Sequence, residues 1–360
     1  MNGEKIIMNK LIKLVTSLLI LFSVLLGSDQ RIKTLGGNSL YWPDDDSNIE
    51  YFPQLVNNYN IAQISGIRTN SDSLYGKLIW GDNNKYGFSW NEADEHDVLN
   101  FYMGTGSLGL RLGLLSSATD TLDSGNETSE LGLSGSMGAN NEDLDLGLHV
   151  STYSSDDGTT SDQHEQFTTD VYFRMAMDAW VLKNMAASLH YASSNDDFNI
   201  ASTPLAFDIT VLSAQLGFFN TINISDNATA MLAISTSFSS MKNFEGNRDL
   251  SIETIHLPNF TFGVEGIINE WAKARIGLNK NYQLTKKTNL PGGSTKSVRS
   301  GEDLKKAFGL GFNYGAFNLD LYVSEGLFTN PVQHIVGFED LEPGSGPNSS
   351  SVIATVTYTW

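Results

Sequence analysis

Residues 107–115 read SLGLRLGLL, a run in which leucine returns at every second position. Successive side chains of a β-strand point to opposite faces, so the leucines at even positions would share one face and the glycines and the arginine the other. The same alternation occurs in DLDLGLHV at 143–150, KARIGLN at 273–279, AFGLGFNYG at 307–315 and FNLDLYV at 317–323. The chain is therefore predicted to be all-β from about residue 74 to its end.

The connections between these runs alternate in length. Short ones lie near 81–84, 105–106, 140–142, 181–184, 225–227, 268–271 and 315–316. Longer polar ones lie at 91–97, 118–129, 154–165, 193–206, 240–256, 284–304 and 325–350. In an up-and-down meander this order places all short turns at one end of the sheet and all long loops at the other. That asymmetry is typical of bacterial outer-membrane barrels, which have short periplasmic turns and long external loops.

The two faces of the strands decide between a soluble sheet and a membrane barrel. An antiparallel sheet in water packs its apolar face on a second apolar layer, and this chain offers none because nearly every strand has one polar face. Apolar-out, polar-in alternation fits a lipid-facing exterior and a wet lumen, and the sheet must close because an open edge finds no hydrogen-bond partners in lipid. We predict a transmembrane antiparallel up-and-down β-barrel over residues 57–360, in the bacterial outer membrane.

The predicted number of strands is 14–16. Fifteen runs are clear between residues 74 and 360, and a weaker one lies near 59–67. Both chain ends should be periplasmic, so the number is even. It is sixteen if the weak run is a strand, and fourteen if that run and another are not. The run at 207–223 changes phase midway, which predicts a β-bulge.

The N-terminus has the layout of a secretory signal peptide, predicted at residues 1–28. Lys10 and Lys13 precede an apolar run from Leu14 to Leu26, and small residues follow. The run is shorter than the about 20 apolar residues of a membrane-spanning helix, so export with cleavage is favoured over a membrane anchor. Residues 29–56 follow as a periplasmic or lumen-plug segment.

Two stretches resemble known outer-membrane proteins. The last strand, SVIATVTYTW at 351–360, ends on an aromatic residue, and its outer positions resemble the signal that such barrels present to their insertion machinery; these positions are Val356, Tyr358 and Trp360. The segment 33–56, KTLGGNSLYWPDDDSNIEYFPQLV, resembles the opening of the FadL-like hydrocarbon and fatty-acid transporters and of their PorV-like relatives in secretion. Its matching positions are Gly36, Gly37, Asp44, Asp45, Asn48, Pro53 and Leu55.

The FadL-like resemblance covers about 25 residues, and Phe52-Pro53-Gln54 stands where the family usually has Asn-Pro-Ala. Family members have fourteen strands and a short N-terminal segment folded into the barrel. The resemblance therefore implies that residues 29–56 plug the lumen, and it argues against a strand at 59–67.

Composition disfavours several functions. The chain has 41 acidic and 22 basic residues, a net charge of −19 that disfavours nucleic acid as a partner. It has no cysteine, which excludes thiolate metal sites and cysteine nucleophiles. We predict no enzyme, no cofactor and no metal site, because His96 and His164 lie in acidic loops without a nucleophile at a defined spacing. These loops either bind divalent cations at a lipopolysaccharide surface or are simply solvated.

The predicted lumen face carries charged and polar side chains. They are Lys77, Arg111, Asp143, Asp145, His149, Asp170, Arg174, Asp178, His190, Glu265, Lys273, Arg275, Asp320 and Tyr322. Either they form a constriction that selects solutes by charge, or they are ion pairs that fill a narrow interior. The predicted function is passage of small molecules, through an open porin for polar solutes or a plugged transporter for apolar ones. The alternative is a scaffold for exported proteins without transport of its own.

Overall fold

The computed structural model describes residues 29–67, 74–93, 96–121, 126–156, 163–179, 181–200, 203–245, 248–290, 293–297, 304–323 and 352–360. Their strands are β1 (Ile61–Ile67), β2 (Leu74–Trp80), β3 (Asn84–Ala93), β4 (His96–Thr105), β5 (Leu108–Thr121), β6 (Asn126–Asn140), β7 (Leu144–Asp156), β8 (Gln163–Ala179), β9 (Leu182–Ile200), β10 (Thr203–Ser225), β11 (Ala228–Glu245), β12 (Arg248–Asn269), β13 (Ala272–Leu290), β14 (Gly293–Ser297), β15 (Lys305–Tyr314), β16 (Phe317–Val323) and β17 (Val352–Thr359). Sixteen of them form a closed antiparallel barrel, and β14 extends the edge of β13 beyond the start of β15.

The barrel closes through its first strand. β1 pairs with β17 on one side and with β2 on the other, so that Ile61 lies opposite both Thr359 and Ile79. Without β1, the facing edges of β2 and β17 would present unpaired backbone groups to lipid. The weak run near 59–67 is thus a strand, and the prediction of sixteen strands is confirmed. The alternative of fourteen, which the FadL-like resemblance implied, is wrong.

Strands β8 to β13 are longer than a bilayer requires. β10 has 23 residues and β12 has 22, whereas a tilted strand crosses the hydrocarbon core in about 9–11 residues. The segments predicted as loops at 193–206 and 240–256 are in large part strand, because neighbouring strands keep their backbone hydrogen bonds as hairpins beyond the bilayer.

The β-bulge predicted at 207–223 is wrong. β10 pairs with β9 without a register shift from Thr203 to Phe219. Ile209 and Phe219 are buried on the inner face, whereas Leu212 and Leu216 are exposed on the outer one. The change of phase in the sequence therefore reflects apolar residues on the lumen face and not an inserted residue.

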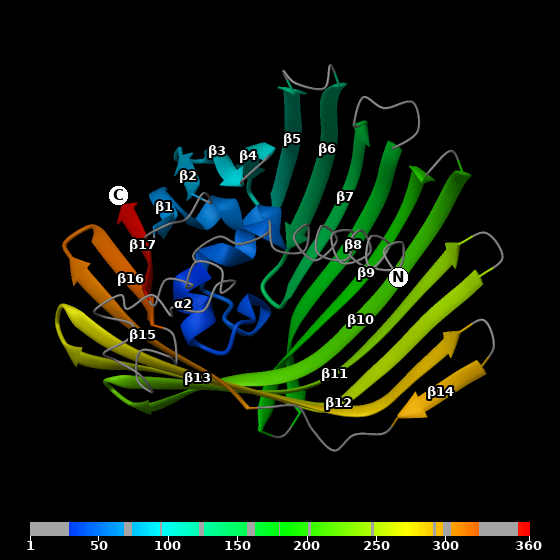
Figure 1. Cartoon of the computed structure of the whole chain (residues 1–360). Helices are drawn as coiled ribbons and strands as arrows, with labels where there is room; N and C mark the ends of the chain where they lie inside the picture. Colours follow the sequence, from blue (N-terminus) through cyan, green and yellow to red (C-terminus); the bar gives the residue numbers. More distant parts are fainter. Residues whose placement is uncertain are drawn as a thin grey trace, which may run out of the picture.

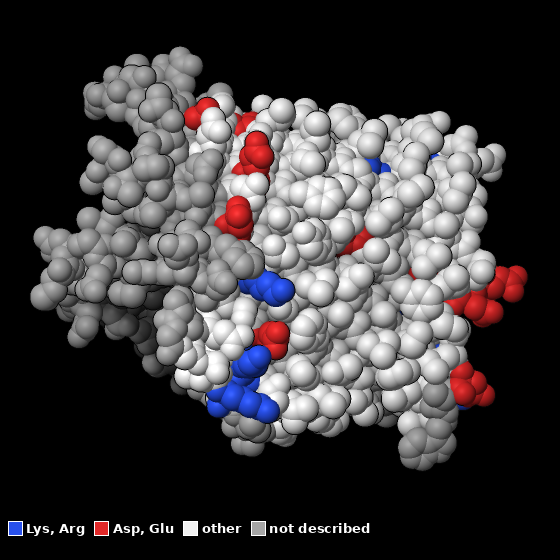
Figure 2. Space-filling view, turned by 90° about the vertical axis from the view of Figure 1, so that its right-hand side faces the viewer, with Lys and Arg blue, Asp and Glu red and all other residues white. Residues whose placement is uncertain are grey.

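The outer face of the barrel is apolar. Leu108, Leu112 and Leu133 are 56%, 65% and 55% exposed, and Figure 2 shows a broad surface with few charged side chains between two rims that carry more of them. Inner residues of the last strand, such as Thr355 and Thr357, are buried. The chain is a transmembrane β-barrel whose leucines face lipid, as predicted.

Aromatic side chains gather on the outer face at the short-turn end. Trp271, Tyr314 and Trp360 are exposed there, and rings stack in the pairs Trp271–Phe312 and Tyr358–Trp360. Such rings prefer the bilayer interface, so this girdle marks one edge of the apolar belt. Val356, Tyr358 and Trp360 share the outer face of β17, and their role as an assembly signal stays a prediction.

The described helices precede the barrel in sequence. They are α2 (Asp29–Thr34) and the 3₁₀ helices η1 (Ser39–Tyr41), η2 (Asp46–Glu50) and η3 (Pro53–Asn58). Within the described ranges, no helix is long and apolar enough to cross a membrane. Residues 1–28, predicted as a signal peptide, lie outside the described residues.

Leu112→Arg is expected to lower the free energy of unfolding by about 2–4 kcal/mol, the cost of an arginine on the lipid face near the bilayer midplane. Leu112 is suitable because it is exposed on the outer face of β5, which pairs on both sides. Urea unfolding in phospholipid vesicles, followed by tryptophan fluorescence, measures the change. The control Tyr314→Arg lies beside a short turn, where the cost falls to about 0–1 kcal/mol. Equal effects of the two variants would contradict a lipid-facing exterior.

Candidate functional site

Residues 29–58, here called the plug, lie inside the barrel (Figure 1). The plug sits at the short-turn end. Asn57 Nδ2 donates to the carbonyl of Gly106 in the β4–β5 turn (3.0 Å), and Gln54 Nε2 donates to that of Ala139 next to the β6–β7 turn (3.2 Å). Residues 59–60 join the plug to β1, so it is a short arm of the first strand.

Residues of the FadL-like match shape the plug's backbone. Gly36 and Gly37 have φ angles of 104° and 81°, a conformation that favours glycine, and they turn the chain after α2. The carboxylate of Asp45 accepts a hydrogen bond from Ser47 N (3.0 Å) and caps η2, and Pro53 occupies the first turn of η3. These residues fit a structural role in the turns and helix starts of the plug.

Two further matched residues hold the plug together. Asn48 Nδ2 donates to the carbonyl of Trp42 at 2.7 Å. The carbonyl of Asp44 accepts from the hydroxyl of Tyr59 at 3.0 Å. The first contact closes a turn within the plug, and the second ties Asp44 to the link between the plug and β1, so both stabilise the shape of this segment.

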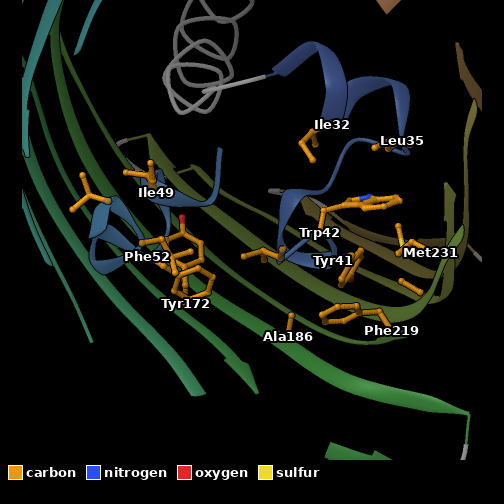
Figure 3. Packing of buried hydrophobic residues seen from close by; sticks show 14 of the residues in the cluster. Ile32, Leu35, Tyr41, Trp42, Ile49, Phe52, Tyr172, Ala186, Phe219 and Met231 are labelled. Carbon is orange, nitrogen blue, oxygen red and sulfur yellow. The ribbon is translucent and has the colours of Figure 1, made fainter. Parts of the chain in front are cut away.

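Apolar side chains of the plug pack on the inner wall. The cluster includes Leu35, Tyr41, Trp42, Ile49 and Phe52 from the plug, and Tyr172, Phe219 and Met231 from the strands (Figure 3). The rings of Tyr41 and Phe219 are 5.3 Å apart, and those of Phe52 and Tyr172 are 6.4 Å apart. A wet, polar lumen was predicted, and the structure differs at this level because the apolar inner residues of the strands find partners in the plug.

Glycines on the inner face let the plug backbone approach the wall. A Cβ added to Gly263 would lie 2.6 Å from the carbonyl oxygen of Leu35, and one added to Gly277 would lie 2.7 Å from that of Thr34. A Cβ added to Gly109 or Gly147 would also meet plug backbone, whereas one added to Gly104, Gly138, Gly217 or Gly309 would meet plug side chains. All eight are here called seat glycines. The glycines of the alternating pattern are therefore contact sites for the plug.

A buried carboxylate of the plug binds three strands. Glu50 Oε1 accepts hydrogen bonds from the hydroxyls of Tyr102 (2.7 Å) and Tyr75 (3.2 Å), and Glu50 Oε2 pairs with Arg111. Burial alone would raise the pKa of Glu50, but Arg111, Lys77 and the hydrogen bonds outweigh it, so the pKa lies below the ordinary value. Glu50 is therefore ionised and anchors the plug at neutral pH.

The neighbouring carboxylate of the plug makes a second pair with the wall. Asp46 Oδ2 lies 3.0 Å from Lys77 Nζ and accepts from Gln63 Nε2 at 2.9 Å. Lys77 and Arg111 were predicted to line the lumen, and they do face inward. Both of them hold the plug.

On the opposite side, a cation of the plug joins acidic residues. Arg31 pairs with Asp45 inside the plug and with Glu265 of β12, whose Oε2 is 3.2 Å away. Arg275 of β13 lies 2.6 Å from both Glu265 and Asp320. Burial by itself would lower the pKa of Arg31, but the two carboxylates raise it above its ordinary value. Charge complementarity thus holds both ends of the plug.

No protein-family model matches the chain, and no curated protein matches its sequence. Similar solved structures include the alcaligin outer-membrane receptor FauA of Bordetella pertussis, with 8% identity over 73% of this chain and 42% of that one and a TM-score of 0.44. The copper transporter OprC is similar with 12% identity over 73% of this chain and 46% of that one and a TM-score of 0.42. The toluene transporter TodX of Pseudomonas putida is similar with 10% identity over 93% of this chain and 98% of that one and a TM-score of 0.41. The chain spans less than half the length of FauA and OprC. Likenesses this low establish neither a family nor a function.

Other predicted lumen residues pair within the wall. Arg174 Nη2 lies 2.7 Å from Asp145 Oδ2, and Gln54 of the plug donates to Asp145 Oδ1 at 3.4 Å. His190 Nδ1 lies 2.6 Å from Asp170 Oδ1. These charges therefore lie in pairs on the inner wall.

The remaining inward residues flank these pairs. His149 Nδ1 accepts from Arg111 Nη2 (2.9 Å) and lies 2.7 Å from Ser136 Oγ. Lys273 Nζ is 3.5 Å from Glu265 Oε1. Tyr322 is half-buried in β16.

The structure differs from the prediction at Asp143 and Asp178. Asp143 lies in the turn before β7, where its N–H donates to Asn141 Oδ1 (3.0 Å). Its side chain is exposed. The Asp178 side chain is 83% exposed and pairs with Lys183 near the β8–β9 turn. Neither carboxylate lies in the interior.

Sequence reasoning missed the partners that the plug supplies. Arg31, Asp46 and Glu50 were not singled out, although the acidic stretch at 44–50 (DDDSNIE) is opposite in charge to Lys77 and Arg111. The middle parts of the acidic loops, at residues 94–95, 122–125 and 157–162, lie outside the described residues. Binding of divalent cations or lipopolysaccharide by these loops therefore stays a prediction.

Proposed function

We propose that the chain is an outer-membrane transporter for small molecules, in which the plug holds the lumen closed at the short-turn end. The observation that carries the proposal is the docking of Glu50, which binds Tyr75, Tyr102 and Arg111 on three different strands. The contacts of Arg31 across the barrel also support a folded segment that stands in the path of a solute.

The same contacts argue against a permanently open porin. An open pore presents charged side chains to passing ions, whereas Lys77, Arg111 and Arg275 are each held in ion pairs. Passage through a lumen filled in this way requires the plug to move. Because only residues 59–60 separate it from β1, the plug moves while it stays attached.

Recordings in planar bilayers test the proposal. We expect the wild-type chain to conduct no steady current, and urea at a concentration that leaves the barrel folded to open conductance reversibly. Far-UV circular dichroism follows the barrel, and cleavage by trypsin after Arg31 or Lys33 reports release of the plug. A steady current without urea would indicate an open porin. Silence after the plug has been released would instead support the scaffold.

A further inference from the structure

Beyond the plug, the inner faces of β10 to β13 form a surface of small polar side chains. Ser213, Ser237, Asn259, Asn279 and Gln283 make up this surface, here called the neutral wall. The strand register brings its members together, since His256 lies between Ser237 and Gln283, and Asn259 lies opposite Asn281 of β13. The Asn259 Nδ2 donates to Ser237 Oγ at 3.3 Å.

The neutral wall lies on the side of the plug that faces away from the short turns. The seat glycines Gly217, Gly263 and Gly277 mark where the plug touches β10, β12 and β13. Asn259 follows four residues beyond Gly263 in the direction away from the β12–β13 turn, and Gln283 six residues beyond Gly277. Because a strand rises about 3.3 Å per residue, these offsets place the wall directly beyond the plug along the lumen. A solute that enters from the long-loop end meets the wall before the plug, and one that enters from the short-turn end meets it after the plug.

The neutral wall carries no formal charge. Between the seat glycines and the level of His256 and Gln283, the described inner positions of these four strands hold no Asp, Glu, Lys or Arg, and His256 is the titratable side chain among them. Lys286 of β13 lies beyond this level, on the same face as Thr254 and Ser239. Closer to the short turns, Glu265 of β12 and Arg275 of β13 lie at the level of the plug and are paired with each other. The charged layer and the neutral layer are thus separate.

Several side chains of this region have unused hydrogen-bonding capacity. Asn259 Oδ1, Gln283 Nε2 and Asn243 Oδ1 have no hydrogen-bond partner among the described residues, and all three residues are more than nine-tenths buried. A buried amide atom without a partner costs about 1–3 kcal/mol. A ligand that offers both donors and acceptors would recover this cost.

We infer that the neutral wall binds uncharged, hydroxyl-rich solutes of the saccharide class, and that these are the substrates of the proposed transporter. The inference rests on the proposed function. Hydroxyl groups both donate and accept, as the serine, asparagine and glutamine side chains do. An apolar solute would leave the amides unpaired, and an ionic solute would find no opposite charge on the wall to replace its hydration.

Binding to the full-length wild-type protein tests the inference without opening the plug. Saturation-transfer NMR in lipid nanodiscs is run with an equimolar mixture of neutral mono-, di- and trisaccharides, and separately with gluconate and with laurate. We expect transfer to the saccharides. Asn259→Ala and Gln283→Ala should each raise the dissociation constants of the saccharides about tenfold, which is the effect of losing one hydrogen bond of about 1.4 kcal/mol. The control Asn141→Ala lies in an exposed short turn and should leave binding unchanged.

The outcomes separate this inference from the proposed function. No transfer to any saccharide, or saccharide transfer that both wall variants leave intact, would overturn the inference. Transfer to gluconate or laurate that Asn259→Ala abolishes would overturn it as well. If the protein binds saccharides but conducts no current after the plug has been released, the binding site is supported and the proposed transport function is overturned. Comparison of heated and unheated samples on gels confirms that each variant is folded, and two independent wall variants keep the test decisive if one fails to fold.

Discussion

A full-length chain with leucine in place of Gly109 is expected to conduct ions without urea. A Cβ at this position would overlap the backbone of Pro53 and Gln54. That backbone cannot yield easily, because Pro53 begins η3 and the side chain of Gln54 is bonded to the carbonyl of Ala139. Overpacking a well-packed interior costs about 1–3 kcal/mol, which lowers the population of the docked plug by about 5- to 150-fold. Single-channel recording measures the result.

The matched control is Gly135→Leu on β6. A Cβ there meets nothing within 4 Å, and the position shares its face with the exposed Leu133 and Met137. The added leucine would contact lipid and leave the plug undisturbed, so this variant should stay silent. Silence from both variants, with both barrels folded, would show that the plug does not depend on the seat glycines.

Glu50→Gln is expected to release the plug even more completely. The substitution leaves Arg111 buried without a counter-charge, since the two side chains are only 5% and 3% exposed. Breaking a buried ion pair on one side costs about 3–5 kcal/mol. Trypsin cleavage after Arg31 in intact vesicles measures plug release alongside conductance. The double variant Glu50→Gln with Arg111→Gln removes the uncompensated charge and should restore part of the docking. A double variant as open as the single one would rule out the ion pair as the anchor.

The same carboxylate predicts how the plug responds to acid. The pKa of Glu50 lies below the ordinary value of about 4.3, because the attraction of Arg111 and Lys77 outweighs burial. A carboxylate with a lowered pKa stabilises the docked state at all pH values above the ordinary pKa, and this stabilisation is lost as the pH falls through the lowered pKa. Wild-type conductance should stay low from neutral pH to about 4.3 and rise below it. Glu50→Gln should lack this transition, and a wild-type transition near pH 6.5 would point to a histidine instead.

The outer surface could be predicted from the sequence because only two environments compete for each strand residue. Leu112 and Arg111 are neighbours, and a period of two sends one to lipid and the other inward. Ile209 and Phe219 misled the prediction, since apolar side chains on the inner face have the same composition as those outside. Phe219 packs on the plug, whereas Ile209 lies on the inner face outside the cluster that the plug forms.

The interior could not be predicted in the same way. Glu50 meets Arg111 across 61 positions of the chain, and Arg31 meets Glu265 across 234. Such pairs depend on how the closed barrel places its strands, and alternation carries no information on it. Gly109 was assigned to the correct face, yet a glycine opposite leucines has the same pattern whether it faces water or the backbone of Pro53.

The seam between β1 and β17 is also the place where the plug is attached. The plug ends at Asn58, β1 begins at Ile61, and β17 completes the cylinder by pairing with β1. Because residues 59–60 link the plug to β1, the plug stays beside the seam whether it is docked or released. The pairing of Thr359 with Ile61 therefore fixes both the closed cylinder and the point at which the plug is attached to it.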